Sequence, residues 1–161
     1  MNLEINQAIE KIADSYKLDP DVVKAIVTQE SNYNPYAIRF EPEYKYVYDV
    51  THFAQFLLIS TDTEMMTQKC SWGLGQIMGA VAREQGHVGP MGQLFDVDVN
   101  IKHICILIQK LELKAKSLEA VFSSYNGGLG ALLKVKDGIY PNQGYVSSCL
   151  SFYNALKGKA G

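Results

Sequence analysis

The chain has 161 residues, of which 47% are hydrophobic, and its 15 Lys and Arg against 17 Asp and Glu give a formal charge of −2. This length suffices for a single domain that buries roughly two-thirds of its unfolded surface without disulfides or metals. The small net charge argues against the basic surface expected of a protein whose main partner is a nucleic acid or an anionic membrane.

The cysteine spacing and the N-terminal sequence bear on disulfides, zinc binding and membrane segments. Cys70, Cys105 and Cys149 are odd in number and widely spaced, so we expect free thiols rather than a disulfide framework or a zinc site. No basic and apolar leader follows Met1, and no segment reaches the ~18 apolar residues of a membrane span. These features predict synthesis in the cytoplasm without a signal peptide, and no integral membrane segment.

Two amphipathic helices are expected in the first 30 residues. Apolar residues recur at helical spacing from Leu3 to about Tyr16. Asp19 can cap a second helix, and Pro20 suits its first position. Glu30 continues the apolar face of this second helix, which consists of Val22, Val23, Ile26 and Val27.

The segment 31–60 lacks a clear hydrophobic period. Its polar start at 32–35 favours a loop, whereas the aromatic run 44–48 fits a strand, an extended arm or a helix equally well. We therefore expect at most a small β element in the 36–60 region.

Two short helices and one long helix are expected next. Thr61, with Glu64 three residues later, predicts a capping box for a helix that ends near Lys69. Two glycines then interrupt regular structure before a short helix over 79–86. A long helix follows, and its apolar stripe, the best candidate for the centre of the core, consists of Ile101, Ile104, Cys105, Ile108 and Leu111.

Two further expectations concern the cap of the long helix and the three histidines. Asp96 or Asp98 can cap the helix. His103 lies off the apolar stripe and is expected to be solvated, and His52, His87 and His103 show no metal-ligand pattern. We expect no metal and no cofactor.

Three more helices are expected in the C-terminal part. One begins at Ser117 and ends at Gly127 and Gly128, and a second lies near 129–137. The last is amphipathic, and its inward-facing residues are Tyr145, Cys149, Phe152, Tyr153 and Leu156. The elements together predict a mainly α protein in which residues 1–161 form one domain.

Glu30 is an unusual carboxylate because it lies on the apolar face of a helix, at its C-terminal end. Partial burial and the helix dipole both disfavour the charged form there, so we expect its pKa to be raised. A carboxyl group that holds a proton near neutral pH is suited to act as a general acid on a glycosidic oxygen. The alternative is that Glu30 ends its helix at the surface or pairs with a lysine.

Three motifs resemble, in their order, those of soluble lytic transglycosylase (SLT) domains of the lysozyme-like superfamily. They are Gln29-Glu30-Ser31, Gly73-Leu74-Gly75-Gln76-Ile77-Met78 and Ser124-Tyr125-Asn126-Gly127-Gly128. Each motif is weak alone, but the resemblance spans about residues 18–153 and extends more distantly to goose-type lysozymes. It implies a lysozyme-like fold with a catalytic groove for peptidoglycan glycan strands.

The resemblance also implies roles for residues of the first two motifs. Glu30 corresponds to the single catalytic acid/base, and Ser31 beside it is expected to bind substrate. Gln76 and Met78 correspond to residues that contact the muramic sugar. Amide side chains suit the N-acetyl and hydroxyl groups of such a ligand.

Two further aromatic positions follow from the resemblance. Tyr125 and Asn126 correspond to the pair that faces the catalytic carboxylate, where a tyrosine hydroxyl can hold a carboxyl group in place. Tyr145 corresponds to an aromatic residue of the closing helix. For Tyr145 we favour core packing over contact with a sugar ring.

The sequence departs from the family pattern between the first two motifs. Gly75 stands where the family usually has methionine, and the interval between Glu30 and Gly73 is long. A family serine that touches the N-acetyl group therefore has no match. The interval contains Arg39-Phe40-Glu41-Pro42, which is similar to a variant of phage-type members.

Glu41 is a second candidate acid because it lies close to Glu30 in sequence. The alternative, which we weigh equally, is that Glu41 forms an ion pair with Arg39 or Lys45 and organises the loop. The lesser candidates are Asp49, Asp62 and Glu64.

The expected reaction is that of a lytic transglycosylase, in which Glu30 cleaves between N-acetylmuramic acid and N-acetylglucosamine and leaves a 1,6-anhydro end. Most glycosidases use two carboxylates, whereas the family resembled here uses one. One alternative is a hydrolytic muramidase with Glu41 or Asp62 as second acid. Met78, however, stands where goose-type lysozymes have an aspartate.

A second alternative is an inactive wall-binding or virion-structural domain, which the retention of Glu30, Gln76, Tyr125 and Asn126 argues against. Peptidoglycan lies outside the cytoplasm, and no export signal is recognised. We therefore expect delivery with the help of a partner: a holin, as for a bacteriophage endolysin, a virion, or a secretion machine.

Overall fold

Helical segments make up most of residues 2–158, which the computed structural model describes. The α-helices are α1 (Asn2–Ser15), α2 (Pro20–Ser31), α3 (Val50–Leu57), α4 (Thr61–Gln68), α5 (Gly79–Glu84), α6 (Val97–Glu112), α7 (Leu118–Gly127) and α8 (Gln143–Lys157). Two 3₁₀ helices are η1 (Met91–Phe95) and η2 (Leu129–Lys134). The strands are β1 (Ile38–Phe40), β2 (Cys70–Trp72) and β3 (Ile77–Met78). The predicted mainly α, lysozyme-like class is confirmed.

Local signals determine the first two helices. The carboxylate of Asp19 accepts a hydrogen bond of 3.0 Å from a backbone N–H in the first turn of α2, where Pro20 also lies. The helix ends where Asn32 adopts a left-handed φ of 49°. Both predicted helices are confirmed, and Glu30 lies in the last turn of α2.

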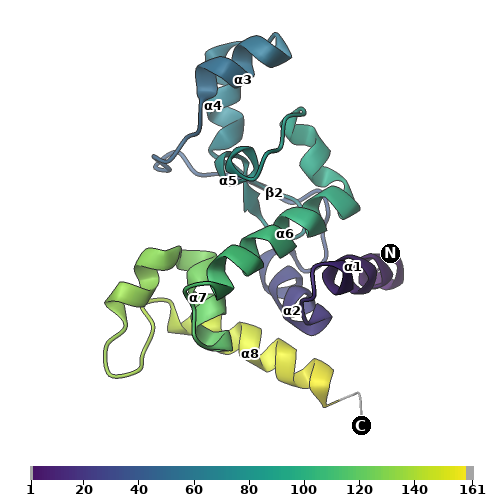
Figure 1. The fold of residues 1–161 in the computed structure, drawn as a ribbon, viewed down its shortest axis with the longest axis vertical. Helices are drawn as coiled ribbons and strands as arrows, with labels where there is room; N and C mark the ends of the chain where they lie inside the picture. The colour runs from purple at the N-terminus through teal and green to yellow at the C-terminus, as the bar shows by residue number, and fades with distance from the viewer. Residues whose placement is uncertain (1, 159–161) are drawn as a thin grey trace.

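Helix α6 crosses the middle of the molecule (Figure 1) and packs against α1 and α7. Asp96 rather than Asp98 caps it, accepting a hydrogen bond of 3.0 Å from the backbone N–H of Val99. The predicted apolar stripe is buried. The expectation for His103 is wrong: its residue is only 7% exposed, because the end of α5 covers this side of α6 and the Gln85 side chain hydrogen-bonds to its ring.

The C-terminal helices pack against one another and, through α8, against α2. The hydroxyl of Ser117 caps α7, as predicted, and η2 ends three residues before the expected limit of 137. Helix α8 packs against α2 and α7. Its inward row repeats every four residues and consists of Tyr145, Cys149 and Tyr153. Phe152 lies one position off this row and is 36% exposed, so its predicted inward orientation is wrong.

The sheet is small and antiparallel, in the order β1-β2-β3. Ile38 of β1 lies opposite Trp72 of β2, and Trp72 lies opposite Ile77 of β3. Strand β1 falls in the predicted 36–60 region, whereas β2 and β3 lie beyond it. Gly73, with a φ of +67°, turns the chain between β2 and β3, so this glycine forms a hairpin where an interruption of regular structure was expected.

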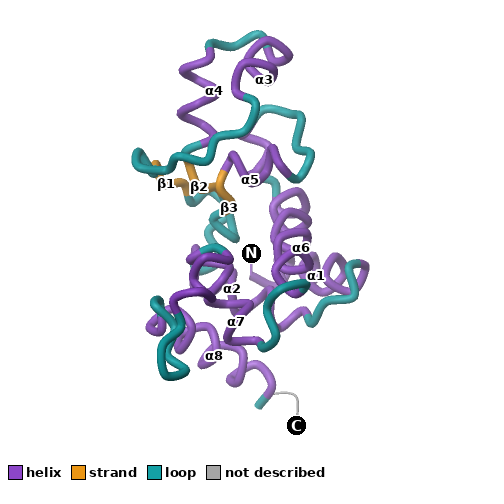
Figure 2. Tube along the Cα trace, turned by 60° about the vertical axis from the view of Figure 1, so that its left-hand side comes forward, coloured by secondary structure: helices purple, strands orange, loops and turns teal. Residues whose placement is uncertain are grey.

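Helices α3 and α4 project together at one end of the molecule (Figures 1 and 2). The aromatic run 44–48, whose structure the sequence left open, has no regular secondary structure. The predicted capping box is wrong: Ser60 caps α4, with its hydroxyl accepting a hydrogen bond of 3.0 Å from the backbone N–H of Thr63. Thr61 is already helical, and Glu64 turns into the interior.

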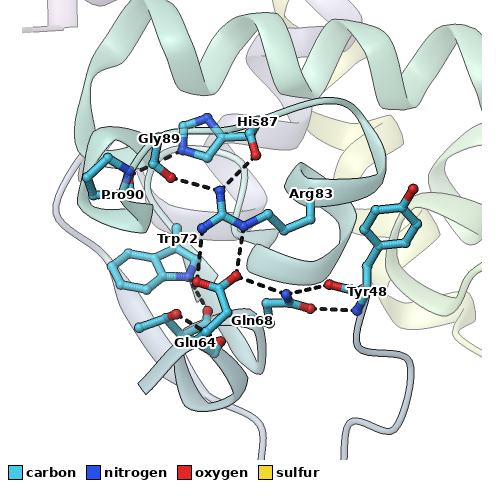
Figure 3. A network of polar contacts seen from close by, with 9 residues as sticks. Tyr48, Glu64, Gln68, Trp72, Arg83, His87, Gly89 and Pro90 are labelled. Carbon is cyan, nitrogen blue, oxygen red and sulfur yellow. Dashed lines mark hydrogen bonds and ion pairs between the residues drawn. The ribbon is translucent and has the colours of Figure 1, made fainter. Parts of the chain in front are cut away.

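A buried polar network joins α4 to α5 (Figure 3). Glu64 and Arg83 are 0% and 1% exposed and form a two-pronged ion pair, with nitrogen to oxygen distances of 2.8 and 3.0 Å. Gln68 donates to the same carboxylate at 2.9 Å and pairs with the backbone of Tyr48. The remaining guanidinium nitrogen of Arg83 donates to two backbone carbonyls of the 87–89 turn. Every group of this ion pair is therefore satisfied within the protein.

The three cysteines, Cys70, Cys105 and Cys149, are free, as expected, and the last two are buried. Within residues 2–158, no helix has the length and apolar character needed to cross a membrane. The prediction that 1–161 is one domain includes residue 1 and residues 159–161, which lie outside the described part.

Candidate active site

A cleft of about 430 Å³ lies where the end of α2, the sheet and helices α5 to α7 meet. Its lining consists of Glu30, Arg39, Glu41, Glu43, Tyr44, Ser71, Gln76, Ile77, Met78, Val81, Leu107, Tyr125 and Asn126. The three predicted motifs all contribute to this lining, although they are far apart in the sequence. Of the predicted site residues, Ser31 and Tyr145 do not line the cleft, and neither do the lesser candidate acids.

Glu30 presents its carboxyl group to the cleft and is half-buried. The hydroxyl of Tyr145 donates a hydrogen bond of 2.6 Å to its Oε1. Burial raises the pKa of Glu30, and the hydrogen bond from Tyr145 and the positive charge of Arg39 oppose this effect in part. The direction is the one the sequence predicts, and it favours a carboxyl group that carries a proton.

The tyrosine hydroxyl that contacts Glu30 is that of Tyr145, not that of Tyr125. Tyr125 lines the cleft, but its hydroxyl donates a hydrogen bond of 2.8 Å to the carbonyl of Gly75. Tyr145 packs against the core, as favoured, and also holds Glu30 with its hydroxyl, which sequence reasoning missed. Burial raises the pKa of both tyrosines, so both hydroxyls remain donors.

The predicted sugar-binding residue Gln76 is engaged with the protein. Its side-chain oxygen accepts from the Ser71 hydroxyl at 2.9 Å, and its amide nitrogen donates to the carbonyls of Ala37 and Gly73. Its backbone has a left-handed φ of 48°. Gln76 therefore joins the residue before β1 to the β2–β3 hairpin, and its amide nitrogen makes both of its hydrogen bonds within the protein.

The other predicted contacts divide into two groups. Met78 and Asn126 line the cleft, and Asn126 is oriented by a hydrogen bond of 2.9 Å that Asn142 donates to its side-chain oxygen. Ser31 does not line the cleft, and its hydroxyl donates to the carbonyl of Leu74 at 2.8 Å. Ser31 therefore ties α2 to the hairpin, which is a structural role.

Asn100 is a positioning residue that sequence reasoning missed. It is 1% exposed, accepts from the backbone N–H of Gly75 at 2.9 Å, and donates to the carbonyls of Trp72 and Leu94. A polar residue in the first turn of an otherwise apolar helix face was the available signal. Together with Tyr125 and Ser31, Asn100 holds residues 73–75 in place beneath the cleft.

Gly75 is required by close packing. A Cβ at this position would collide with the side chain of Ile104 and with the hydroxyl of Tyr125. The departure from the methionine usual in the family therefore follows from the close approach of α6 and α7 to the hairpin.

The structure places the candidate second acids in different surroundings. Glu41 lines the cleft and forms the expected ion pair with Arg39, while its role as a second acid stays a prediction. Asp62 is exposed on α4 and Asp49 is exposed before α3, and neither lines the cleft. Glu64 is the buried partner of Arg83.

Among residues 2–158, no group of three or more His, Cys, Asp and Glu side chains is arranged to hold a metal ion. The arrangement suits proton transfer by one carboxyl group on the wall of the cleft.

The comparison with known families agrees with the motifs that form the cleft. The family described as the transglycosylase SLT domain matches residues 7–144, which include Glu30, the hairpin and Tyr125. No match to a curated protein was found. Since the match covers most of the 161 residues, the chain belongs to the transglycosylase SLT domain family, whose members act on peptidoglycan.

Proposed function

We propose that the chain is a lytic transglycosylase that cleaves the β-1,4 bond between N-acetylmuramic acid and N-acetylglucosamine and forms 1,6-anhydro ends. The observation that carries the proposal is the environment of Glu30. Its half-buried carboxyl group lies on the cleft and accepts a hydrogen bond from Tyr145, and burial raises the pKa of this carboxyl group. Membership of the SLT family supports the substrate class.

In the first step, Glu30 donates its proton to the glycosidic oxygen. The hydroxyl of Tyr145 donates to Oε1, so the proton of the carboxyl group belongs on Oε2. The bond between C1 of the muramic residue and the glycosidic oxygen breaks, and the oxygen leaves as the hydroxyl of the next sugar. The acetamido group of the muramic residue stabilises the positive charge at C1.

In the second step, Glu30 acts as a base. Its carboxylate accepts the proton of the muramic 6-hydroxyl while that oxygen forms a bond to C1, so no water is consumed and Glu30 is again protonated. A hydrogen bond to a carboxylate is stronger than one to a neutral acid. Tyr145 therefore stabilises the ionised group between the two steps.

The cleft wall supplies the binding surface in this proposal. Met78 and Leu107 give apolar contacts to the sugar rings, and Asn126 gives an amide for a hydroxyl or N-acetyl group. Gln76 and Tyr125 act indirectly, because their polar groups hold the hairpin.

A hydrolytic muramidase is the second candidate, because Glu41 also lines the cleft. A second carboxylate could direct water to C1 and give a reducing muramic end. The ion pair with Arg39 argues against this role, since it restrains Glu41 as the partner of a cation. The two reactions differ by one water in the mass of the product.

The test is a digest of purified peptidoglycan analysed by mass spectrometry, with wild type, Glu30→Gln and the matched control Glu112→Gln. Glu112 is an exposed glutamate at the far end of α6. The proposal expects anhydro products from wild type and the control, and none from Glu30→Gln. Hydrated products would instead support the muramidase, and activity retained by Glu30→Gln would overturn the role of Glu30. Binding without products from wild type would support the inactive wall-binding domain.

The working location follows from the substrate. We propose that the protein acts on the cell wall, after delivery by a holin, a virion or a secretion machine. Fractionation of producing cells with and without a holin tests the first of these routes.

A further inference from the structure

Arg39 and Glu41 stand together on the wall of the cleft. Both line it, and the Nε of Arg39 forms an ion pair with Oε1 of Glu41. Residues two apart on an extended strand point to the same side. The backbone here is held by the sheet: Arg39 lies opposite Ser71, and the N–H of Glu41 donates to the carbonyl of Lys69 at 2.9 Å.

Arg39 is the single basic side chain among the described residues that line the cleft. Its side chain is 74% exposed, and its terminal nitrogens have no hydrogen-bond partner within residues 2–158. The ion pair with Glu41 is therefore the contact that restrains an otherwise free guanidinium group.

The other ionisable groups around Glu30 carry no positive charge. Helix α7 contributes Tyr125, helix α8 contributes Tyr145 and Cys149, and the segment after β1 contributes Glu41, Glu43 and Tyr44. Burial raises the pKa of Tyr125, Tyr145 and Cys149, so these three remain neutral. Among the residues that the structure describes, Arg39 is the cation whose charge acts on the carboxyl group of Glu30.

We propose that Arg39 and Glu41 are positioning residues for the catalytic carboxyl group: Glu41 fixes the guanidinium of Arg39 on the cleft wall, and the positive charge of Arg39 stabilises the ionised form of Glu30. The inference rests on the proposed function of Glu30. It assigns Glu41 to the support of a cation rather than to a second acid.

The pair matters because one carboxyl group must serve as both acid and base. Burial alone would favour the protonated form of Glu30 and disfavour its carboxylate form. A cation nearby offsets part of that penalty when the proton has left. Because Arg39 is mostly exposed, solvent and salt screen its charge, and the effect is modest.

The test is the pH dependence of kcat/KM on soluble, uncrosslinked glycan strands. Activity requires protonated Glu30 in the free enzyme, so it falls as the pH rises through the pKa of Glu30. Removing the cation in Arg39→Gln should move this alkaline limb upward by about half a pH unit. Arg39→Lys should keep most of the wild-type position, and the shift of Arg39→Gln should shrink in high salt.

Lys45→Gln is the matched control, since it removes an equal charge from an exposed residue of the same segment that does not line the cleft. Its alkaline limb should coincide with that of wild type. An unchanged limb in Arg39→Gln, or an equal shift in Lys45→Gln, would overturn the proposed role of Arg39.

The part assigned to Glu41 is tested by coupling. If Glu41 holds the guanidinium in place, the shift caused by Arg39→Gln should fall below half its size in a Glu41→Gln background. A full shift there, or loss of activity by about 10²-fold or more in Glu41→Gln alone, would refute the positioning role. Failure of the proposed function would give a different result, because Glu30→Gln would then keep its activity. That result does not depend on the position of the alkaline limb in Arg39→Gln.

Discussion

Glu30 and Glu64 are both helical glutamates that are at least half-buried, and their surroundings give them different tasks. Glu64 is fully buried and receives three hydrogen bonds, two from the cation Arg83 and one from Gln68 (Figure 3). Glu30 is half-buried and receives one hydrogen bond, from the neutral hydroxyl of Tyr145. The number and charge of the donors thus separate a carboxylate that stabilises the fold from a carboxyl group that can release its proton.

The largest expected effect is on activity at the first of these sites. Glu30→Gln removes the only proton donor that the proposed mechanism uses, so product release should fall by about 10³-fold or more. The fold should persist, because the amide oxygen still accepts the hydrogen bond of Tyr145. Activity of Glu30→Gln within tenfold of wild type, measured by mass spectrometry of the released fragments, would contradict the catalytic role of Glu30.

The second glutamate should fail through stability instead. Arg83→Leu leaves Glu64 buried without its cation and two carbonyls without a donor, so the free energy of unfolding should fall by about 3–5 kcal/mol. Urea denaturation measures the loss. The double variant Glu64→Leu with Arg83→Leu should recover part of it, and a loss below about 1 kcal/mol in Arg83→Leu would show that the pair is not structural.

A smaller effect is expected when the hydrogen bond of Glu30 is removed. Tyr145→Phe should lower kcat/KM by about tenfold. It should also move the alkaline limb of the pH profile upward, because the hydrogen bond lowers the pKa of Glu30.

Tyr125→Phe is the contrasting variant, since its hydroxyl reaches Gly75 rather than Glu30. It should destabilise the protein by about 1 kcal/mol and leave the limb in place. Equal shifts of the alkaline limb in Tyr145→Phe and Tyr125→Phe would contradict a specific effect of the Tyr145 hydroxyl on Glu30.

The last predicted effect concerns the stability of Glu30→Gln. Burial raises the folded-state pKa of Glu30, so its favourable contribution is present below the unfolded pKa and is lost as the pH rises through the folded pKa. A glutamine never ionises, and the variant should therefore be more stable than wild type at pH 7, by less than about 2 kcal/mol, with a smaller gain at pH 4. Urea titrations at the two pH values measure the difference, and an equal gain at both would contradict the assigned cause.

Short-range signals account for what could be predicted. Asp19, Pro20 and the apolar repeat define α2, and this places Glu30 in its last turn without knowledge of the rest of the chain. The same kind of signal misled at α4, because Thr61 is the predicted cap, whereas the neighbouring hydroxyl of Ser60 serves as the cap in the folded chain.

Long-range contacts account for what could not be predicted. The hydroxyl of Tyr145 meets Glu30 across 115 positions of sequence, and His103 is covered by Gln85 from another helix. Strands β1 to β3 have two or three residues each, too few to show an alternating pattern, and are defined by their pairing. A side chain's role in the site therefore depended on partners that no local pattern reveals.

The most direct test of the account is the titration of the Glu30 carboxyl group, followed by NMR of its labelled δ carbon and assigned by its absence in Glu30→Gln. The account predicts a pKa above 4.5, the ordinary value for glutamate, and a further rise in Tyr145→Phe. A pKa at or below 4.5 in the wild-type protein would mean that Glu30 is an ordinary carboxylate, which contradicts its assignment as the proton donor.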